Sequence, residues 1–384
     1  GSYYSIGGKV MTKARELADL IANVNKGSSL GNKNFIINGA AQVQQRGDLS
    51  ISAGVTNEGF APDRFRVLLS NMGQLAGTFT TVADAPDNTG LTRSIKWTTT
   101  TPENSIDSNE LYSIRHNIEA QNLQSLEYGT SDAKYTTLSF WVKSSVTGTF
   151  GITLYAPDAN QTVTNTYTIA SANTWQYVTW TIPPNTSGTI NNDNGEGLRF
   201  IWQLASGSTY DGGSSNQNNW ISHVNGSWAY GHAQDGVVTT DNATFQLTGL
   251  QYEIGEKATE FEHESYSVTL EKASRYYHRI TFDNGSNRSF PAYNSSTTQA
   301  IANHTYPVTM RTRPTAIETN GTASDYDVAH TNTATNCSAV PSYNEATIFG
   351  TSIISNCSSG LTAGQGSQLR LKNSGAYLAW SAEL

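Results

Sequence analysis

Residues 137–145 read TLSFWVKSS, and every second position in the middle of this stretch is apolar: Leu138, Phe140 and Val142. A period of two is typical of a β-strand that packs one face on a hydrophobic core. The same period recurs in TFGITLYAP (149–157), WQYVTWTIP (175–183) and GLRFIWQLA (197–205). Turn-forming segments rich in Gly, Pro, Asn and Ser separate these runs. The pattern predicts a mainly β chain with two packed antiparallel sheets.

One later strand has an irregular pattern. In FQLTGLQYEI (245–254) the apolar parity changes between Leu247 and Leu250. A regular pleat would expose one half of this set, because successive side chains point to opposite faces. We therefore predict a bulge or bend at Gly249.

Composition narrows the class of protein. The chain has 384 residues, of which 37% are hydrophobic and 14% charged, so it can build folded cores of two or three domains. Its net charge is −8, and Lys and Arg form no long cluster, which argues against nucleic acid or an anionic membrane as partner. The sequence contains no apolar run of about eighteen residues, so no membrane insertion is expected.

A helical pattern precedes the β-rich part. In VMTKARELADLIANVNKG (10–27) an apolar stripe contains Val10, Leu17, Leu20, Ile21 and Val24. An isolated helix of this length is marginal, so the stripe needs a partner. It either packs on its own β domain or meets copies of itself. The seven-residue spacing favours a short coiled coil, but too few heptads are present to fix the number of strands.

The carboxy-terminal third has its own pattern. SVTLEKASRYYHRI (267–280) predicts a helical link, and a second β-rich unit follows it. The two cysteines, Cys337 and Cys357, lie in this unit. They either close one loop as a disulfide or remain two buried thiols, and the sequence leaves both readings open.

Several segments resemble a known family. NKNFIINGAAQVQQRG (32–47), PDRF (62–65), EKASRYYHRI (271–280) and PVTMRTRPT (307–315) are similar to sequences in bacteriophage tail fibres and related virion adhesins. TKARELADLIANV (12–24) looks like the helical connectors that precede such heads. Phe65 stands where relatives often carry Trp, and Ser274 stands where they commonly carry Cys. The resemblance implies a jelly-roll, carbohydrate-binding-module-like sandwich on a homotrimeric fibre at the virion surface.

The resemblance and the patterns together predict three regions. Residues 1–34 form a helical stalk, residues 35–266 a jelly-roll sandwich, and residues 267–384 a linker helix with a distal β domain as receptor-binding tip. Phe35, Ile36 and Ile37 are predicted to form the first strand, and Asn38-Gly39 a tight turn. The glutamines beside Val43 are expected to pair across subunits as part of an edge strand.

The sequence contains no motif of a known catalytic site. It lacks the G-x-S-x-G elbow, the H-E-x-x-H helix, the P-loop and the dinucleotide fingerprint. His223 and His232 lie on one loop, but two exposed imidazoles are commoner than a metal site, and NNDNGEG (191–197) suits a hairpin turn better than a calcium loop. We expect no metal, no cofactor and no catalysis. Paired carboxylates brought together from distant strands would contradict that expectation.

Two segments are candidates for ligand binding. Residues 207–236 form a long segment rich in aromatic and amide side chains, and its candidate glycan contacts are Tyr210, Trp220, Trp228, Tyr230 and His232. The alternative is that its tryptophans cover the end of the sandwich or a neighbouring subunit. Polar loops in the distal unit add Tyr293 and Tyr326.

These observations favour a fragment of a phage tail-fibre or receptor-binding protein. It would attach a virion to a bacterial surface glycan or an outer-membrane receptor without catalysis. Its expected partners are two further copies of itself and, on its amino-terminal side, a virion tail or capsid protein. The alternatives are a polysaccharide depolymerase (a glycoside hydrolase or lyase) and a purely structural virion fibre.

Overall fold

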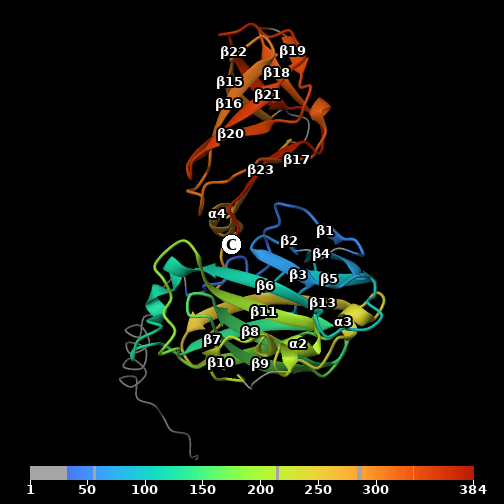
Figure 1. Cartoon of the computed structure of the whole chain (residues 1–384), viewed down its shortest axis with the longest axis vertical. Coiled ribbons are helices and arrows are strands. Elements are labelled where there is room, and N and C mark those ends of the chain that lie inside the picture. The colour runs from blue at the N-terminus through green and yellow to red at the C-terminus, as the bar shows by residue number, and fades with distance from the viewer. Residues whose placement is uncertain (1–32, 55–57, 213–215, 283–287, 332) are drawn as a thin grey trace, which may run out of the picture.

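The computed structural model describes residues 33–54, 58–212, 216–282, 288–331 and 333–384. The predicted helix at 10–27, with Val10, Leu17, Leu20, Ile21 and Val24, lies outside the described residues. The buried hydrophobic side chains form two separate clusters, one from residue 36 to residue 252 and the other from residue 290 to residue 382. Figure 1 shows the corresponding two units, with helix α4 (Tyr266–Ser274) between them.

The larger unit is an antiparallel sandwich of two sheets. The six-stranded sheet has the order β1 (Leu49–Ile51), β4 (Ala76–Val82), β5 (Ser94–Thr101), β13 (Thr244–Ile254), β7 (Thr136–Ser144), β10 (Gln176–Ile182). The seven-stranded sheet has the order β12 (Ile221–Ser222), β9 (Gln161–Ile169), β8 (Gly148–Ala156), β11 (Glu196–Ser206), β6 (Leu111–Glu119), β3 (Phe65–Ser70), β2 (Glu58–Phe60). Short helices in the connections are η1 (Ala120–Leu126), α2 (Ser208–Asp211), η2 (Asn225–Ser227) and α3 (Gly236–Thr239). The chain passes repeatedly from one sheet to the other, as in jelly rolls, and the predicted mainly β fold class is confirmed.

The alternating residues meet between the sheets. Leu138, Phe140 and Val142 of β7 are fully buried in the core. The ring of Phe140 lies 5.8 Å from that of Trp202 on β11, edge to face, so the two sheets contact each other through these aromatic side chains. The alternate residues of the same strands consequently face outward.

The irregularity predicted at Gly249 is confirmed. The pairing of β13 with β7 shifts register between Thr248 and Gln251, and Gly249 has φ +60°. A Cβ at this position would lie 2.8 Å from Leu91 Cδ1 and 3.1 Å from Trp141 Cδ1. Gly249 is therefore required both by its backbone conformation and by the space around it.

The segment after residue 33 forms a turn and not the strand predicted at Phe35–Ile37. Residues 37–40 are a turn, and Asn38 has φ +65°, so the tight turn at Asn38-Gly39 is confirmed. The Asn38 side chain accepts from Val43 N (3.0 Å) and donates to Val43 O (2.8 Å). The amide thus supplies the hydrogen bonds that a neighbouring strand would otherwise provide.

The smaller unit is also built from antiparallel strands. Its seven-stranded sheet has the order β19 (Thr333–Asn336), β18 (Tyr326–His330), β22 (Gly366–Leu371), β15 (Arg288–Asn294), β16 (Gln299–Thr305), β21 (Gly350–Asn356), β20 (Ser342–Ala346). A three-stranded sheet has the order β14 (Tyr277–Thr281), β23 (Tyr377–Ser381), β17 (Glu318–Thr319), and η3 (Ala323–Asp325) precedes β18. The helix predicted to run to residue 280 ends at Ser274, because residues 277–281 pair with β23.

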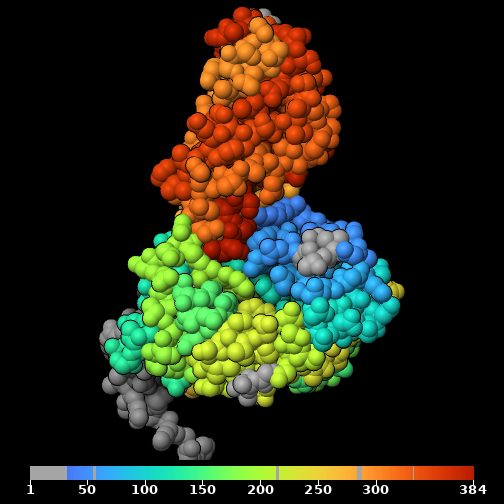
Figure 2. All heavy atoms as spheres, in the orientation of Figure 1, coloured from blue at the N-terminus to red at the C-terminus, as the bar shows by residue number. Residues whose placement is uncertain are grey.

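The first and last parts of the chain meet between the two units. Gln45 Nε2 donates to Tyr277 O (2.7 Å), and Arg279 donates to Arg46 O (2.8 Å). Figure 2 shows the carboxy-terminal residues, in dark red, at this junction beside the blue amino-terminal part of the sandwich. Residues 41–48 form no strand, so the edge strand predicted there is wrong. The Gln45 amide bonds Asp63 and Tyr277 within its own chain, and the pairing of this segment across subunits stays a prediction.

Cys337 and Cys357, which directly follow β19 and β21, face each other as an isolated antiparallel bridge. Both thiols are free and buried, which corresponds to the second of the two readings left open by the sequence.

Candidate functional site

The described residues of the long segment 207–236 (207–212 and 216–236) lie against the outer side of the seven-stranded sheet. Thr153 Oγ1 and Gln203 Nε2 both donate to Trp228 O, at 2.7 and 2.8 Å. Gly151 N donates to His232 Nδ1 at 3.0 Å. Three polar groups on two strands, β8 and β11, therefore hold Trp228 and His232 in place against the sheet.

The predicted contacts in this segment have different outcomes. Trp220 covers the end of the sandwich, because its Nε1 donates to Pro183 O (2.9 Å) and its ring packs edge-on to Tyr128. The His232 side chain is only 1% exposed and its Nδ1 accepts from Gly151 N, so burial disfavours the predicted direct glycan contact, which stays a prediction. Tyr210 and Tyr230 are half-buried, and their contact with a ligand stays a prediction.

Trp228 belongs to an aromatic cluster on the outer surface. Its ring lies 4.5 Å from that of His223 and 5.0 Å from that of Tyr155, which it meets edge to face. All three side chains are half-buried, so each keeps some surface in contact with solvent. The cluster joins a strand residue, Tyr155 on β8, to two residues of the covering segment.

Three arginines extend from the sheet next to this cluster. Arg66 on β3 stands directly opposite Arg115 on β6, and Arg199 on β11 stands opposite Tyr155. They face outward because the alternate residues of the same strands, such as Phe65, enter the core. We call this surface the arginine–aromatic face and define it by Arg66, Arg115, Arg199, Tyr155, His223 and Trp228.

Two of the three arginines have carboxylate partners. Arg66 pairs with Glu58 at 2.9 Å, and Arg199 Nε donates to Glu196 Oε1 at 2.7 Å. Arg115 is 4% exposed; its Nε donates to Ser113 Oγ (2.9 Å), and its guanidinium lies 5.6 Å from the Trp228 ring. In the part of the chain that the structure describes, no carboxylate forms an ion pair with Arg115.

Burial and like charge act together on this face. Burial, followed by the charges of Arg199 and Arg66, lowers the pKa of Arg115 to about 9. Burial and Arg199 also lower the pKa of His223, which favours its neutral form. The arginine–aromatic face thus brings three guanidinium groups together with the two carboxylates of Glu58 and Glu196.

A second aromatic cluster lies on the outer side of the six-stranded sheet. Trp141 and Tyr177 are cross-strand neighbours with ring centroids 5.1 Å apart, and Lys143 Nζ lies 4.9 Å from the Trp175 ring. None of these residues was among the contacts predicted from the sequence. The alternation of apolar residues along the strands predicts that both face outward, because Trp141 lies between the inward-facing Phe140 and Val142, and Tyr177 precedes the inward-facing Val178.

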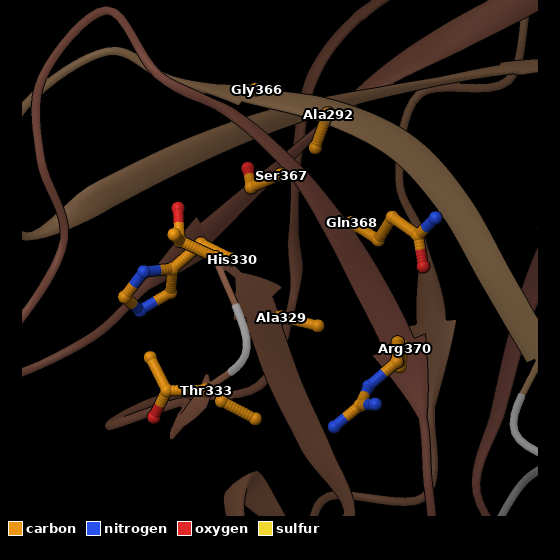
Figure 3. A pocket seen from close by; sticks show the side chains of 10 residues that line it. Ala292, Ala329, His330, Thr333, Gly366, Ser367, Gln368 and Arg370 are labelled. Carbon is orange, nitrogen blue, oxygen red and sulfur yellow. The ribbon is translucent and has the colours of Figure 1, made fainter.

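The distal unit contains a pocket of about 740 Å³. In Figure 3, His330 and Thr333 lie on one side of it, and Gln368 and Arg370 on the other. Arg370 is already paired with Asp327 through two contacts of 2.8 Å. Among the described residues that line this pocket, His330 is the only one with a ring, so the pocket offers little surface for stacking against a sugar.

The two tyrosines predicted for the distal unit differ in exposure. Tyr293 on β15 is 49% exposed and remains a candidate contact. Tyr326 is fully buried and its hydroxyl donates to Tyr377 O (2.7 Å), so burial disfavours the glycan contact that the sequence predicts for it, which stays a prediction. In the sequence both tyrosines occur in polar segments, and the difference in their burial comes from the packing of β18, which begins at Tyr326.

A smaller pocket of about 340 Å³ lies on the same unit and contains His278 and His304. Their Nε2 atoms are 3.1 Å apart, and burial lowers the pKa of each to about 4. No described Asp or Glu lines this pocket or the 740 Å³ pocket.

The described residues contain no group of three or more His, Cys, Asp or Glu side chains placed to hold a metal ion. No helix among them has the length and apolar character needed to cross a membrane.

Comparisons with known proteins return structures of low similarity. The enzymatically active domain of tailspike protein 4 from bacteriophage CBA120 aligns over 58% of this chain and 22% of its own, with 14% identity and a TM-score of 0.31. The family 11 carbohydrate-binding module from Clostridium thermocellum, in complex with a β-1,3-1,4-mixed-linked tetrasaccharide, aligns over 55% and 98%, with 12% identity and a TM-score of 0.24. The CBM22-1–CBM22-2 tandem domain of Xyn10C from Paenibacillus barcinonensis aligns over 93% and 100%, with 11% identity and a TM-score of 0.27.

This chain thus spans about a fifth of the length of the tailspike chain. No protein-family model matches the sequence, and no curated protein matches it. Scores this low assign the chain to no family.

Proposed function

We propose that this protein binds a glycan through the arginine–aromatic face, without catalysis, as the receptor-binding part of a phage tail fibre. The observation that carries the proposal is the cluster of Tyr155, His223 and Trp228, which is fixed on the outside of a rigid sheet beside charged donors. Flat rings stack on the C–H faces of sugars, and arginine N–H groups donate to sugar oxygens.

Preorganisation supports the same function. The Trp228 carbonyl accepts two hydrogen bonds from the sheet, and Asn216, earlier in the segment, accepts from Thr164 Oγ1 at 2.8 Å. A surface that is already ordered loses little conformational entropy when a ligand binds. This favours binding even when a single site makes few contacts.

The distribution of carboxylates supports a non-catalytic role. Glycoside hydrolysis commonly uses two carboxyl groups that flank the scissile bond. The two pockets have no described acidic lining residue, and the acids beside the arginine–aromatic face, Glu58 and Glu196, are engaged in ion pairs with arginines. We therefore propose attachment in preference to depolymerisation.

The proposal includes three copies of the chain on one fibre, joined by the predicted coiled coil at 10–27. Three linked sites raise the apparent affinity for a repetitive polysaccharide through effective concentration. On the virion, the amino-terminal side would then join a tail or capsid protein, and the sandwich and distal unit would face the host.

A glycan array and a host-cell binding assay test this function. Trp228→Ala should reduce retention of glycan or cells by at least about tenfold, a loss of roughly 1.4 kcal/mol or more. Tyr177→Ala removes a tyrosine from the opposite sheet and is the matched control. Loss of binding in the Tyr177 variant with full binding in the Trp228 variant would place the binding site on the six-stranded sheet and contradict the proposal.

Two further outcomes separate the alternative functions. New reducing ends or unsaturated sugars released from host polysaccharide would identify a depolymerase. Absence of binding to every glycan and to host cells by the intact oligomer would favour a purely structural fibre.

A further inference from the structure

We infer that the arginine–aromatic face takes an acidic glycan, whose carboxylate or phosphate binds at the guanidinium of Arg115. This inference rests on the proposed glycan-binding function and specifies its ligand class. It assigns to Arg115 the binding of the acid group of the ligand, a role that was not predicted from the sequence.

The charges on this face do not balance. Arg66, Arg115 and Arg199 bring three positive charges, whereas only Glu58 and Glu196 form ion pairs with them. Among the described residues, the terminal nitrogens of Arg115 also have no hydrogen-bond acceptor, since its hydrogen bond to Ser113 Oγ uses Nε. One guanidinium is therefore left without the partner that its neighbours have.

Such an arrangement is costly in the free protein. A charged group that is 4% exposed loses most of its hydration, and two like charges nearby add repulsion. Cation–π contact with Trp228 at 5.6 Å offsets part of this cost. An anionic group of a ligand would offset the rest of this free-energy cost, because a carboxylate or phosphate accepts two parallel N–H hydrogen bonds from one guanidinium.

The distances favour an acid group carried directly on a sugar ring. The Arg115 guanidinium lies 5.6 Å from the centre of the Trp228 ring, and the Arg199 guanidinium lies 5.5 Å from that of Tyr155. A sugar stacked on Trp228 or Tyr155 would therefore place a ring substituent within reach of an arginine. Neutral sugars would make the same stacking contact but leave Arg115 without a counter-charge.

Isothermal titration with matched ligands tests the inference. Oligomers of glucuronic, galacturonic and N-acetylneuraminic acid are each compared with their methyl esters, and a sugar phosphate with the unphosphorylated sugar. At least one acidic member should bind at least about tenfold more tightly than its neutral counterpart. Raising NaCl from about 50 mM to about 500 mM should weaken that binding in the unmodified protein, because salt screens the charge pair.

Substitution of Arg115 supplies a second readout. Arg115→Met should abolish the preference for the acidic ligand while leaving the melting temperature unchanged or higher, because an unpaired buried charge is removed. Arg115→Lys should retain part of the preference, since lysine keeps the charge but not the two-pronged geometry. Arg93→Met, a half-buried arginine that bonds Thr81 outside this face, is the control.

The outcomes separate this inference from the proposed function. Equal binding of acidic and neutral sugars, lost in Trp228→Ala but unchanged in Arg115→Met, would overturn the acidic-ligand inference and keep glycan binding. No binding to any member or to host cells would overturn both. A melting temperature that falls further in Arg115→Met than in Arg93→Met would show that Arg115 is needed for folding and would contradict the inference.

Discussion

The guanidinium of Arg64 donates a hydrogen bond to the carboxylate of Glu383, 319 positions further along the chain. Arg64 is buried directly before β3, stacks over the Tyr276 ring at 3.5 Å and donates to Asn117 O at 2.7 Å. Glu383 also pairs with Arg46 at 3.1 Å. One carboxylate from the end of the second unit thus neutralises two arginines of the first and joins the two units.

Glu383→Ala should destabilise the protein by about 3–5 kcal/mol, because it leaves the Arg64 guanidinium buried without its counter-charge. Urea unfolding followed by tryptophan fluorescence measures the loss. Glu127→Ala breaks the exposed pair with Lys134 and should cost no more than about 1 kcal/mol. Equal effects of the two substitutions would mean that Glu383 does not hold the units together.

Gly249→Ala should destabilise the sandwich by about 1–3 kcal/mol. The backbone there has φ +60°, and a Cβ would meet Leu91 and Trp141 closely. Gly73→Ala is the control, since its φ is not positive and a Cβ would meet nothing within 4 Å. Thermal unfolding should show a lower melting temperature for the Gly249 variant alone.

Acid should destabilise the distal unit through His278 and His304. Burial, with His304 as a second cause for His278, lowers the pKa of both groups to about 4, whereas an unfolded histidine titrates near 6.5. Between these values the unfolded chain binds more protons, so stability is present above about pH 6.5 and is lost as the pH falls toward 4. Because both rings are half-buried, we expect about 1–3 kcal/mol for the pair.

The measurement is the melting temperature from pH 7.5 to pH 4.5. His278→Gln/His304→Gln should show a shallower fall than the unmodified chain. His263→Gln, which changes an exposed imidazole on the sandwich, serves as control. A double variant with the full pH dependence would assign the acid sensitivity to other groups.

The oligomeric state tests the coiled-coil prediction. Light scattering of the whole chain should give three times the protomer mass of 41.5 kDa, and deletion of residues 1–32 should give a single protomer. The reason is that the stripe from Val10 to Val24 is the predicted association surface. A trimer that survives the deletion would place the contact in the sandwich or the distal unit.

The sequence by itself determined the class of fold and several local features. The period of two in residues 137–145 fixes which side chains of β7 enter the core, because the pleat alternates faces whatever the neighbouring strand is. The parity change around Gly249 required a bulge for the same reason, and Asn38-Gly39 required a turn. These are local rules, and they were confirmed where the structure describes the residues.

Tertiary structure alone decided which side chains form a site. Tyr293 and Tyr326 have similar sequence surroundings, yet one is exposed and the other buried, because burial depends on what packs above a strand. Arg66, Arg115 and Arg199 are spread over more than 130 positions and meet only because β3, β6 and β11 are neighbours in one sheet. Strand order is set by contacts between segments far apart in the chain, and local patterns do not encode those contacts.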